Sequence, residues 1–229
     1  MQKNELERFS TLNNLCVLHK IIDLRKQISE WKSEGLSVGL VPTMGGLHNG
    51  HRSLIKLASK KCDRVIVSIF INPTQFGDDE DFETYPQTQK SDITLISEAG
   101  GDAAFIPNVS EMYPRGFSTK VSVIGLTNML CGASRPGHFD GVTQVVAKLL
   151  NQVSADMAFF GEKDWQQLTI IKRLVRDLDI PTKIVNVATV RDEFGLALSS
   201  RNSYLNSSQL EIARKLSSVL QMTAYNIAS

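Results

Sequence analysis

The sequence lacks an excess of charge of either sign. Its 25 lysines and arginines nearly balance 24 aspartates and glutamates, which gives a formal net charge of +1. A chain without a strong overall field does not draw nucleic acid or an anionic membrane surface to itself, so an anionic ligand must be held by a local cluster. The sequence also has no apolar run near the roughly 18 residues that a membrane span requires. We therefore expect neither a nucleic-acid partner nor a membrane.

Cysteine is scarce as well. Cys16, Cys62 and Cys131 are odd in number and form no CxxC pair, which is typical of reduced thiols in a cytosolic protein and argues against a disulfide framework or a zinc site. The first ten residues contain no apolar segment behind basic residues, so no secretory signal is expected. These absences predict a cytoplasmic protein. The acidic run at 78–81 could suggest a metal site, but a solvated loop is the favoured interpretation and no metal ligand is assigned.

What the sequence does contain is an alternation of strand and helix patterns over most of its 229 residues. This alternation predicts an α/β fold, a Rossmann-like parallel sheet with helices on both faces. Pro42 is expected to end the first strand. Strands are expected at 37–41, 64–71, 103–106, 157–160 and 183–190, with a weak peripheral strand at 120–123, and helices at 21–34, 51–62, 88–99, 142–153, 165–178 and 208–225.

The most unusual loops each follow a predicted strand directly. They lie at 42–50, 72–86, 161–164 and 191–201. In a parallel sheet, ligands bind beyond the carboxyl ends of the strands, near a topological switch point. We therefore expect these four loops to open on the same edge of the sheet.

The first loop reads PTMGGLHNGH and ends at His51. Its glycines let backbone amides approach an anion closely, and a helix that begins near His51 would turn its free N–H groups toward that anion. His48 and His51 can reach the same side of a ligand, each as a neutral donor that becomes cationic only when an anion arrives. The loop is not a Walker motif, which needs Lys and Ser/Thr where His51 and Arg52 stand. The alternative is a glycine-rich turn whose histidines only cap the helix.

Two further loops carry cations. In GEKDWQQ, at 161–167, Lys163 can meet phosphates as a point charge, and Asp164 is a candidate helix N-cap. In LALSSRN, at 196–202, two hydroxyls and the guanidinium of Arg201 suit a triphosphate or a departing pyrophosphate. Taken alone, each loop is also compatible with a solvated surface turn.

Two other loops carry polar side chains of a different kind. Gln75 in INPTQFG can donate to a carboxylate and accept from a hydroxyl, which suits a small hydroxy acid. In RPGHFDG, Arg135 and His138 either face a ligand or brace the loop. Asp140 in the same loop is a candidate N-cap for the valine-striped helix that follows.

Together these segments resemble the pantothenate synthetase (pantoate–β-alanine ligase) family, from about residue 21 to about residue 205. The strings PTMGGLHNGH, SIFINPTQFG, CGASRPGHFDG, GEKDWQQL and TVRDEFGLALSSRN occur in the family's order and at its spacing. The resemblance implies an adenylate-forming enzyme of the HxGH superfamily with a Rossmann-like nucleotide domain. It also implies ATP, pantoate and β-alanine as substrates, and a homodimer. Mg²⁺ accompanies ATP in this family, and we assign no protein ligand to it.

The resemblance implies site residues position by position. His51 would be the proton donor, and Gln75 and Gln167 would bind pantoate, with Gln75 also near the β-alanine site. We assign His48, His51, Lys163 and Arg201 to the charge that builds on the phosphates. The ATP-binding residues that the resemblance implies are Met44, Gly45, Gly46, Leu47, His48, Asn49, Gly50, His51, Gly161, Glu162, Lys163, Asp164, Val190, Leu198, Ser199, Ser200 and Arg201.

The chain departs from the family pattern at its two ends. About twenty residues at the start have no clear counterpart, and the chain stops soon after the first helix beyond SSRN. Family members usually continue into a small C-terminal domain that closes over the nucleotide. We therefore expect an N-terminal extension at 1–20, a Rossmann-like ATP- and pantoate-binding domain at 21–190, and the incomplete start of a C-terminal lid domain at 191–229.

The implied reaction has two steps. The pantoate carboxylate attacks the α-phosphorus of ATP, and the amine of β-alanine then attacks the pantoyl adenylate. Three alternatives stay open: a nucleotidyltransferase that adenylates a phosphate ester, a non-catalytic nucleotide-binding module, and an RNA-binding fragment of synthetase type. The amides of NPTQF and GEKDWQQ argue against the first, and the balanced charge argues against the last.

Overall fold

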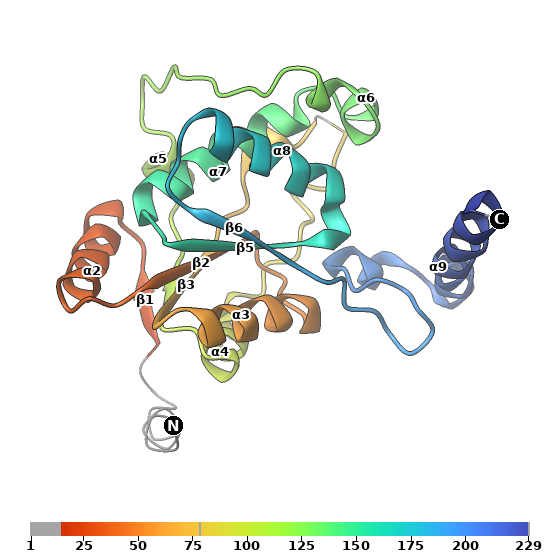
Figure 1. Ribbon diagram of the computed structural model, residues 1–229, viewed down its shortest axis with the longest axis horizontal. Helices are drawn as coiled ribbons and strands as arrows, with labels where there is room; N and C mark the ends of the chain where they lie inside the picture. Colours follow the sequence, from red (N-terminus) through yellow and green to blue (C-terminus); the bar gives the residue numbers. More distant parts are fainter. Residues whose placement is uncertain (1–14, 78, 229) are drawn as a thin grey trace.

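The computed structural model describes residues 15–77 and 79–228, so the expectations for residues 1–14 and for Asp78 lie outside the described residues. The described chain forms a six-stranded, all-parallel sheet in the order β1-β4-β3-β2-β5-β6 (Figure 1). This confirms the predicted α/β fold. The strands are β1 Cys16–Leu18, β2 Val38–Thr43, β3 Arg64–Ile69, β4 Ala103–Phe105, β5 Met157–Gly161 and β6 Lys183–Val187.

Helices cover both faces of this sheet. Leu24 and Leu150, on helices of one face, pack into one buried apolar cluster, and Ile55 and Ile96, on helices of the other face, pack into a second. The helical spacing of apolar residues in the sequence predicts which stripe of each helix is buried. Burial of that stripe against the sheet stabilises the layers. The first face carries α2 Ile21–Ser33, α7 His138–Val153 and α8 Trp165–Asp177, and the second carries α3 Asn49–Lys61 and α4 Gln89–Ala99.

The strand order reverses between β2 and β5. The chain runs from β2 outward to β3 and β4 on one side, then returns to place β5 on the other side of β2. The β2–β5 ladder pairs only Gly39 and Leu40, whereas the β2–β3 ladder continues to Thr43. The two central strands therefore part at their carboxyl ends, and this is the switch point at which open α/β sheets bind ligands.

The expectation that Pro42 ends the first strand is wrong. Strand β2 runs through Pro42 to Thr43. Proline cannot donate to a ladder, but here the ladder with β5 has already ended at Leu40, so the missing N–H has no strand partner to lose on that side.

Three other local expectations differ from the structure. Strand β1 was not predicted, because only three residues pair with β4. Residues 120–123 form no strand: the backbone N–H and carbonyl of Val121 bond instead to the side chains of Gln144 and Thr143 on α7. Asp140 is not an N-cap, because α7 begins at His138 and its N-cap residue is Gly137. Asp140 instead accepts from the hydroxyl of Ser122.

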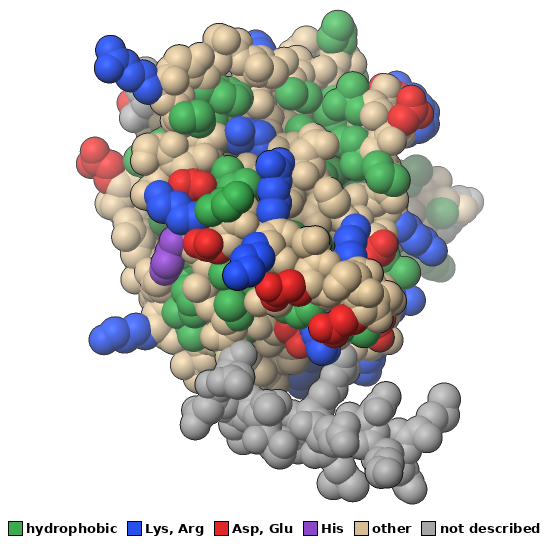
Figure 2. All heavy atoms as spheres, turned by 90° about the vertical axis from the view of Figure 1, so that its left-hand side faces the viewer, with side chains coloured by type: hydrophobic (Ala, Val, Ile, Leu, Met, Phe, Trp, Pro, Cys, Tyr) green, Lys and Arg blue, Asp and Glu red, His purple; other side chains and the backbone are tan. Residues whose placement is uncertain are grey.

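The last helix, α9 Ser207–Ala228, extends away from the sheet and its covering helices (Figure 1). Large apolar side chains along it, such as Leu216 and Leu220, are exposed. None of the helices in the described part of the chain is both long and apolar enough to cross a membrane. On the face turned toward the viewer in Figure 2, basic, acidic and apolar side chains are interspersed.

Candidate active site

A pocket opens where β2 and β5 part, and the loops that follow β2, β3, β5 and β6 all contribute to it. The expectation that these loops meet at one edge of the sheet is confirmed. Of the residues singled out from the sequence, the pocket is lined by Met44, His48, Gly50, His51, Gln75, Arg135, His138, Gly161, Lys163, Asp164, Gln167, Val190, Leu198, Ser199, Ser200 and Arg201. Five others lie in the same loops but do not line it: Gly45, Gly46, Leu47, Asn49 and Glu162.

Two histidines lie at the start of α3. His48 is the N-cap residue, and its ring Nδ1 accepts from the backbone N–H of Gly50 at 3.1 Å. The Nδ1 atom of His51 accepts in turn from the backbone N–H of His48 at 3.3 Å. A neutral imidazole carries one N–H, so a ring that accepts at Nδ1 must donate from Nε2. Capping and ligand binding are therefore not competing roles, because the cap fixes the tautomer and leaves each Nε2–H as a donor.

Both rings are held neutral. Burial lowers the pKa of His51 to about 3, with the nearby His48 and Lys163 acting in the same direction. Burial and Lys163 also lower the pKa of His48. The two rings lie 4.2 Å apart between centroids, so two positive charges there would repel strongly. At neutral pH the pair therefore offers hydrogen-bond donors without charge.

Asp92 of α4 holds the glycine-rich turn in place by hydrogen bonds. This buried carboxylate accepts from the backbone N–H groups of Gly46, at 3.1 Å, and Leu47, at 2.8 Å, and from the hydroxyl of Thr88 at 3.0 Å. The expectation that the backbone amides of this loop face an anion is therefore not met at Gly46 and Leu47. Their N–H groups shape the turn, while the histidine rings face the pocket.

Lys163 is the exposed cation of the pocket wall that follows β5. Its ammonium lies 3.2 Å from a carboxylate oxygen of Asp164. Asp164 occupies the N-cap position of α8 as expected, but its side chain makes no capping hydrogen bond. Its carboxylate faces Lys163 instead, which leaves the helix N-terminus without a carboxylate on it.

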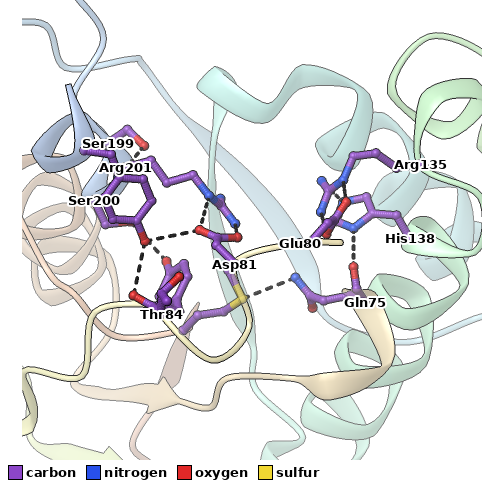
Figure 3. A network of polar contacts seen from close by, with 12 residues as sticks. Gln75, Glu80, Asp81, Thr84, Arg135, His138, Ser199, Ser200 and Arg201 are labelled. Atoms are coloured by element: carbon purple, nitrogen blue, oxygen red, sulfur yellow. Dashed lines mark hydrogen bonds and ion pairs between the residues drawn. The ribbon is translucent and has the colours of Figure 1, made fainter. Parts of the chain in front are cut away.

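The acidic loop after β3 holds two arginines, one on each side of it (Figure 3). Arg201 donates from Nε and Nη2 to the carboxylate of Asp81 at 2.8 and 2.7 Å. Arg135 donates from the same two atoms to Glu80 at 2.5 Å each. These bonds hold the pKa of each carboxyl below its usual range. The interpretation of this run as a solvated loop is therefore wrong for Glu80 and Asp81.

Part of the pocket wall is apolar. Gln75 sits in a short 3-10 helix at Pro73–Gln75, and Gln167 lies in the first turn of α8. Both line the pocket beside the apolar face of α7, which contributes Val142, Val145, Val146 and Leu149. The valine stripe thus serves both the core and the pocket.

Sequence reasoning missed two residues of this region. Tyr85, which lines the pocket and bonds to the hydroxyl of Ser200 at 3.1 Å, stands in a polar stretch that gives no periodic signal. Asp92 reads as an ordinary helix residue, because its partners lie more than forty positions earlier in the chain. Within residues 15–77 and 79–228, no group of three or more His, Cys, Asp or Glu side chains is placed to hold a metal ion.

A parallel sheet with a polar pocket at its switch point, a glycine-rich turn before a helix, and paired neutral histidines define a nucleotide-binding α/β protein of the HxGH type. Comparison with known proteins narrows this class. The family model described as pantoate-beta-alanine ligase matches residues 16–228. The chain belongs to the pantoate–β-alanine ligase family.

Similar proteins and structures carry the corresponding names. A pantothenate synthetase of Dinoroseobacter shibae is 53% identical over 93% of this chain and 76% of its own length, and one of Cereibacter sphaeroides is 56% identical over 83% and 68%. The crystal structure of pantothenate synthetase from Thermus thermophilus matches with a TM-score of 0.84 at 46% identity, over 90% of this chain and 74% of that one. A pantoate–β-alanine ligase from Francisella tularensis, described as complexed with beta-gamma ATP and β-alanine, matches with a TM-score of 0.83 at 42% identity, over 90% and 79%.

Proposed function

We propose that this chain condenses (R)-pantoate with β-alanine at the expense of ATP, giving pantothenate, AMP and pyrophosphate. The observation that carries the proposal is one pocket that combines phosphate-type donors with carboxamides. His48, His51 and Lys163 line it together with Gln75 and Gln167. Membership of the family and the names of the relatives agree with this function.

In the first step, a pantoate carboxylate oxygen attacks the α-phosphorus of ATP, and the bond to the bridging oxygen of pyrophosphate breaks. We assign the Nε2–H groups of His48 and His51 and the ammonium of Lys163 to the charge that builds on the phosphates. Donors fixed in place before reaction stabilise such charge without reorganisation, and this is a large contribution to catalysis. Mg²⁺ enters with ATP as part of the substrate.

In the second step, the amine of β-alanine attacks the acyl carbon of pantoyl adenylate, and AMP leaves with the carboxylate oxygen attached to phosphorus. No protein nucleophile is required, so the protein acts by positioning the reactants. The amides of Gln75 and Gln167 suit the hydroxyls and carboxylate of pantoate, and the apolar face of α7 suits its two methyl groups.

In the described structure, Arg201 is already paired with the carboxylate of Asp81. Its guanidinium must exchange the carboxylate of Asp81 for phosphate oxygens, or share its donors between them. Both acceptors are anionic and suit the same planar fork. We propose that ATP takes the place of Asp81 at this guanidinium, in whole or in part.

Organisation and compartment follow as proposals from the sequence. We propose that residues 21–190 bind ATP and pantoate and that residues 191–229 belong to a lid domain, since Leu198 to Arg201 reach back to the pocket. The family resemblance supports a homodimer. The three cysteines are all free, which fits a cytoplasmic enzyme.

Pyrophosphate exchange tests the function directly. Protein, MgATP and pantoate without β-alanine should exchange labelled pyrophosphate into ATP, and pantothenate should form only when β-alanine is added. His51→Ala should lower the exchange rate about a hundred- to a thousandfold, since one preorganised donor is lost. His19→Ala, at an exposed histidine outside the pocket, is the matched control. Normal exchange in a folded His51→Ala protein would remove His51 from the mechanism, and AMP transfer that ignores β-alanine would favour a nucleotidyltransferase.

A further inference from the structure

We propose that His138 is a positioning residue for Gln75: its neutral ring donates Nδ1–H to the backbone carbonyl of Gln75 and so fixes the carboxamide that meets pantoate. The proposal rests on the proposed function, which gives Gln75 to pantoate. It decides between the two roles that the sequence left open for His138, ligand or brace.

The contacts of the ring define its tautomer. Nη1 of Arg135 lies 3.0 Å from Nε2 of His138, and the backbone oxygen of Gln75 lies 2.8 Å from Nδ1 (Figure 3). A guanidinium only donates and a carbonyl only accepts, so Nε2 must accept and Nδ1 must carry the proton. This is the reverse of the tautomer at His48 and His51. Both ring nitrogens of His138 are engaged by protein, and neither is left for a substrate.

The charge state agrees with that geometry. Burial lowers the pKa of His138, and Arg135 acts in the same direction, while the bond to Gln75 and the carboxylate of Glu80 act against them. A cationic ring would place a second positive charge next to the guanidinium of Arg135, at 3.0 Å. The ring is therefore neutral at neutral pH.

The guanidinium that meets His138 is itself fixed. Arg135 uses Nε and Nη2 for the two carboxylate oxygens of Glu80, and this leaves Nη1 turned toward the histidine. Such a two-point contact sets the plane of the guanidinium as well as its position. The result is a continuous chain from the acidic loop through Arg135 and His138 to Gln75 (Figure 3).

Gln75 is held at a second point by its side chain. Its Oε1 accepts from Nδ2 of Asn72 at 3.1 Å, and the same amide nitrogen donates to the backbone oxygen of Gly141 on α7. The Nε2 atom of Gln75 points to the sulfur of Met44 at 3.3 Å. A thioether is a weak acceptor, so a carboxylate or hydroxyl oxygen of the substrate can take its place at little cost. His138 thus fixes the backbone of a residue whose amide N–H is presented to the pocket.

Three substitutions separate positioning from a merely structural role. His138→Ala removes the donor to Gln75 and should raise KM for pantoate about tenfold, the effect of one lost hydrogen bond, with KM for ATP unchanged. His138→Asn places an amide N–H near the position of Nδ1 and should restore KM for pantoate to within about threefold of the parent. His138→Gln carries its amide one carbon farther out and should behave like His138→Ala.

The tautomer is measured on the unmodified protein by nitrogen-15 NMR of the imidazoles. We expect His138 to carry its proton on Nδ1, and His48 and His51 on Nε2. A proton on Nε2 of His138 would overturn the proposal, as would equal changes in both KM values in His138→Ala, or a His138→Asn protein as impaired as His138→Ala. The NMR result stands without turnover, so absence of pantothenate synthesis with the expected tautomer would refute the proposed function and leave the His138 contact intact.

Discussion

At the scale of single residues, the site depends on which nitrogen of each histidine carries the proton. His48 and His51 accept backbone N–H groups at Nδ1 and present Nε2–H, whereas His138 accepts from Arg135 at Nε2 and donates from Nδ1. The neighbours of each ring decide this, since a guanidinium, a carbonyl and a backbone amide each have a fixed role as donor or acceptor. The same residue type therefore serves two purposes in one pocket.

The lowered pKa of His51 predicts an acid-dependent loss of stability. Its pKa is about 3 in the folded protein and near 6.5 as a free side chain, so below about pH 6 the unfolded chain binds a proton that the folded chain refuses. Relative to His51→Asn, the free energy of unfolding of the parent should fall by up to about 1.4 kcal/mol per pH unit between pH 6 and pH 4. Denaturant unfolding at several pH values measures this. A difference between the two proteins that stays constant over this range would contradict the pKa shift.

At the scale of elements, the pocket depends on a close approach between the Pro73–Gln75 turn and the first turns of α7. A Cβ atom at Gly141 would lie 2.3 Å from the backbone oxygen of Thr74 and 2.6 Å from Cα of Gln75. No side chain can move aside there, because the neighbouring atoms belong to the backbone. The glycine therefore permits the contact that places Gln75.

Gly141→Ala should push the turn away from α7. We expect KM for pantoate to rise about tenfold or more, and the free energy of unfolding to fall by about 1–3 kcal/mol, as is usual for overpacking. Gly77→Ala is the matched control, since its Cβ would meet nothing nearer than the side chain of Glu80 at 3.8 Å. If the two variants gave the same kinetics and the same thermal unfolding, the close approach would have no role.

Elements also show where sequence reasoning succeeds and where it stops. Short apolar runs between helical stripes predicted five of the six strands, because a strand covered on both faces is apolar almost throughout. Residues 120–123 show only a weak alternation, and their backbone bonds to the side chains of Gln144 and Thr143 on α7. Pro42 resembles the end of a strand, but β2 continues through it, because the pairing of β2 with β5 has already ended at Leu40. Pattern shows that a segment is buried, but it does not show which partner buries it.

At the scale of the whole molecule, the rule that ligands bind beyond the carboxyl ends of parallel strands predicts from the sequence that the four loops meet at one edge. It could not show that Asp92 fastens the glycine-rich turn, or that Glu80 and Asp81 hold Arg135 and Arg201. These contacts join positions from 45 to 120 residues apart, and one sequence carries no signal for such a pairing. The motifs predict which residues lie in the site, and the structure shows which contacts hold those residues in place.

The central claim is that this pocket joins a pantoate carboxylate to the α-phosphorus of ATP. The most direct measurement follows heavy oxygen (¹⁸O) from the carboxylate of labelled pantoate during synthesis with MgATP and β-alanine. Attack on the α-phosphorus predicts that one labelled oxygen appears in AMP, because that oxygen leaves with the phosphate when the amine attacks the acyl carbon. Label in inorganic phosphate together with ADP, or AMP that carries no label, would contradict the account.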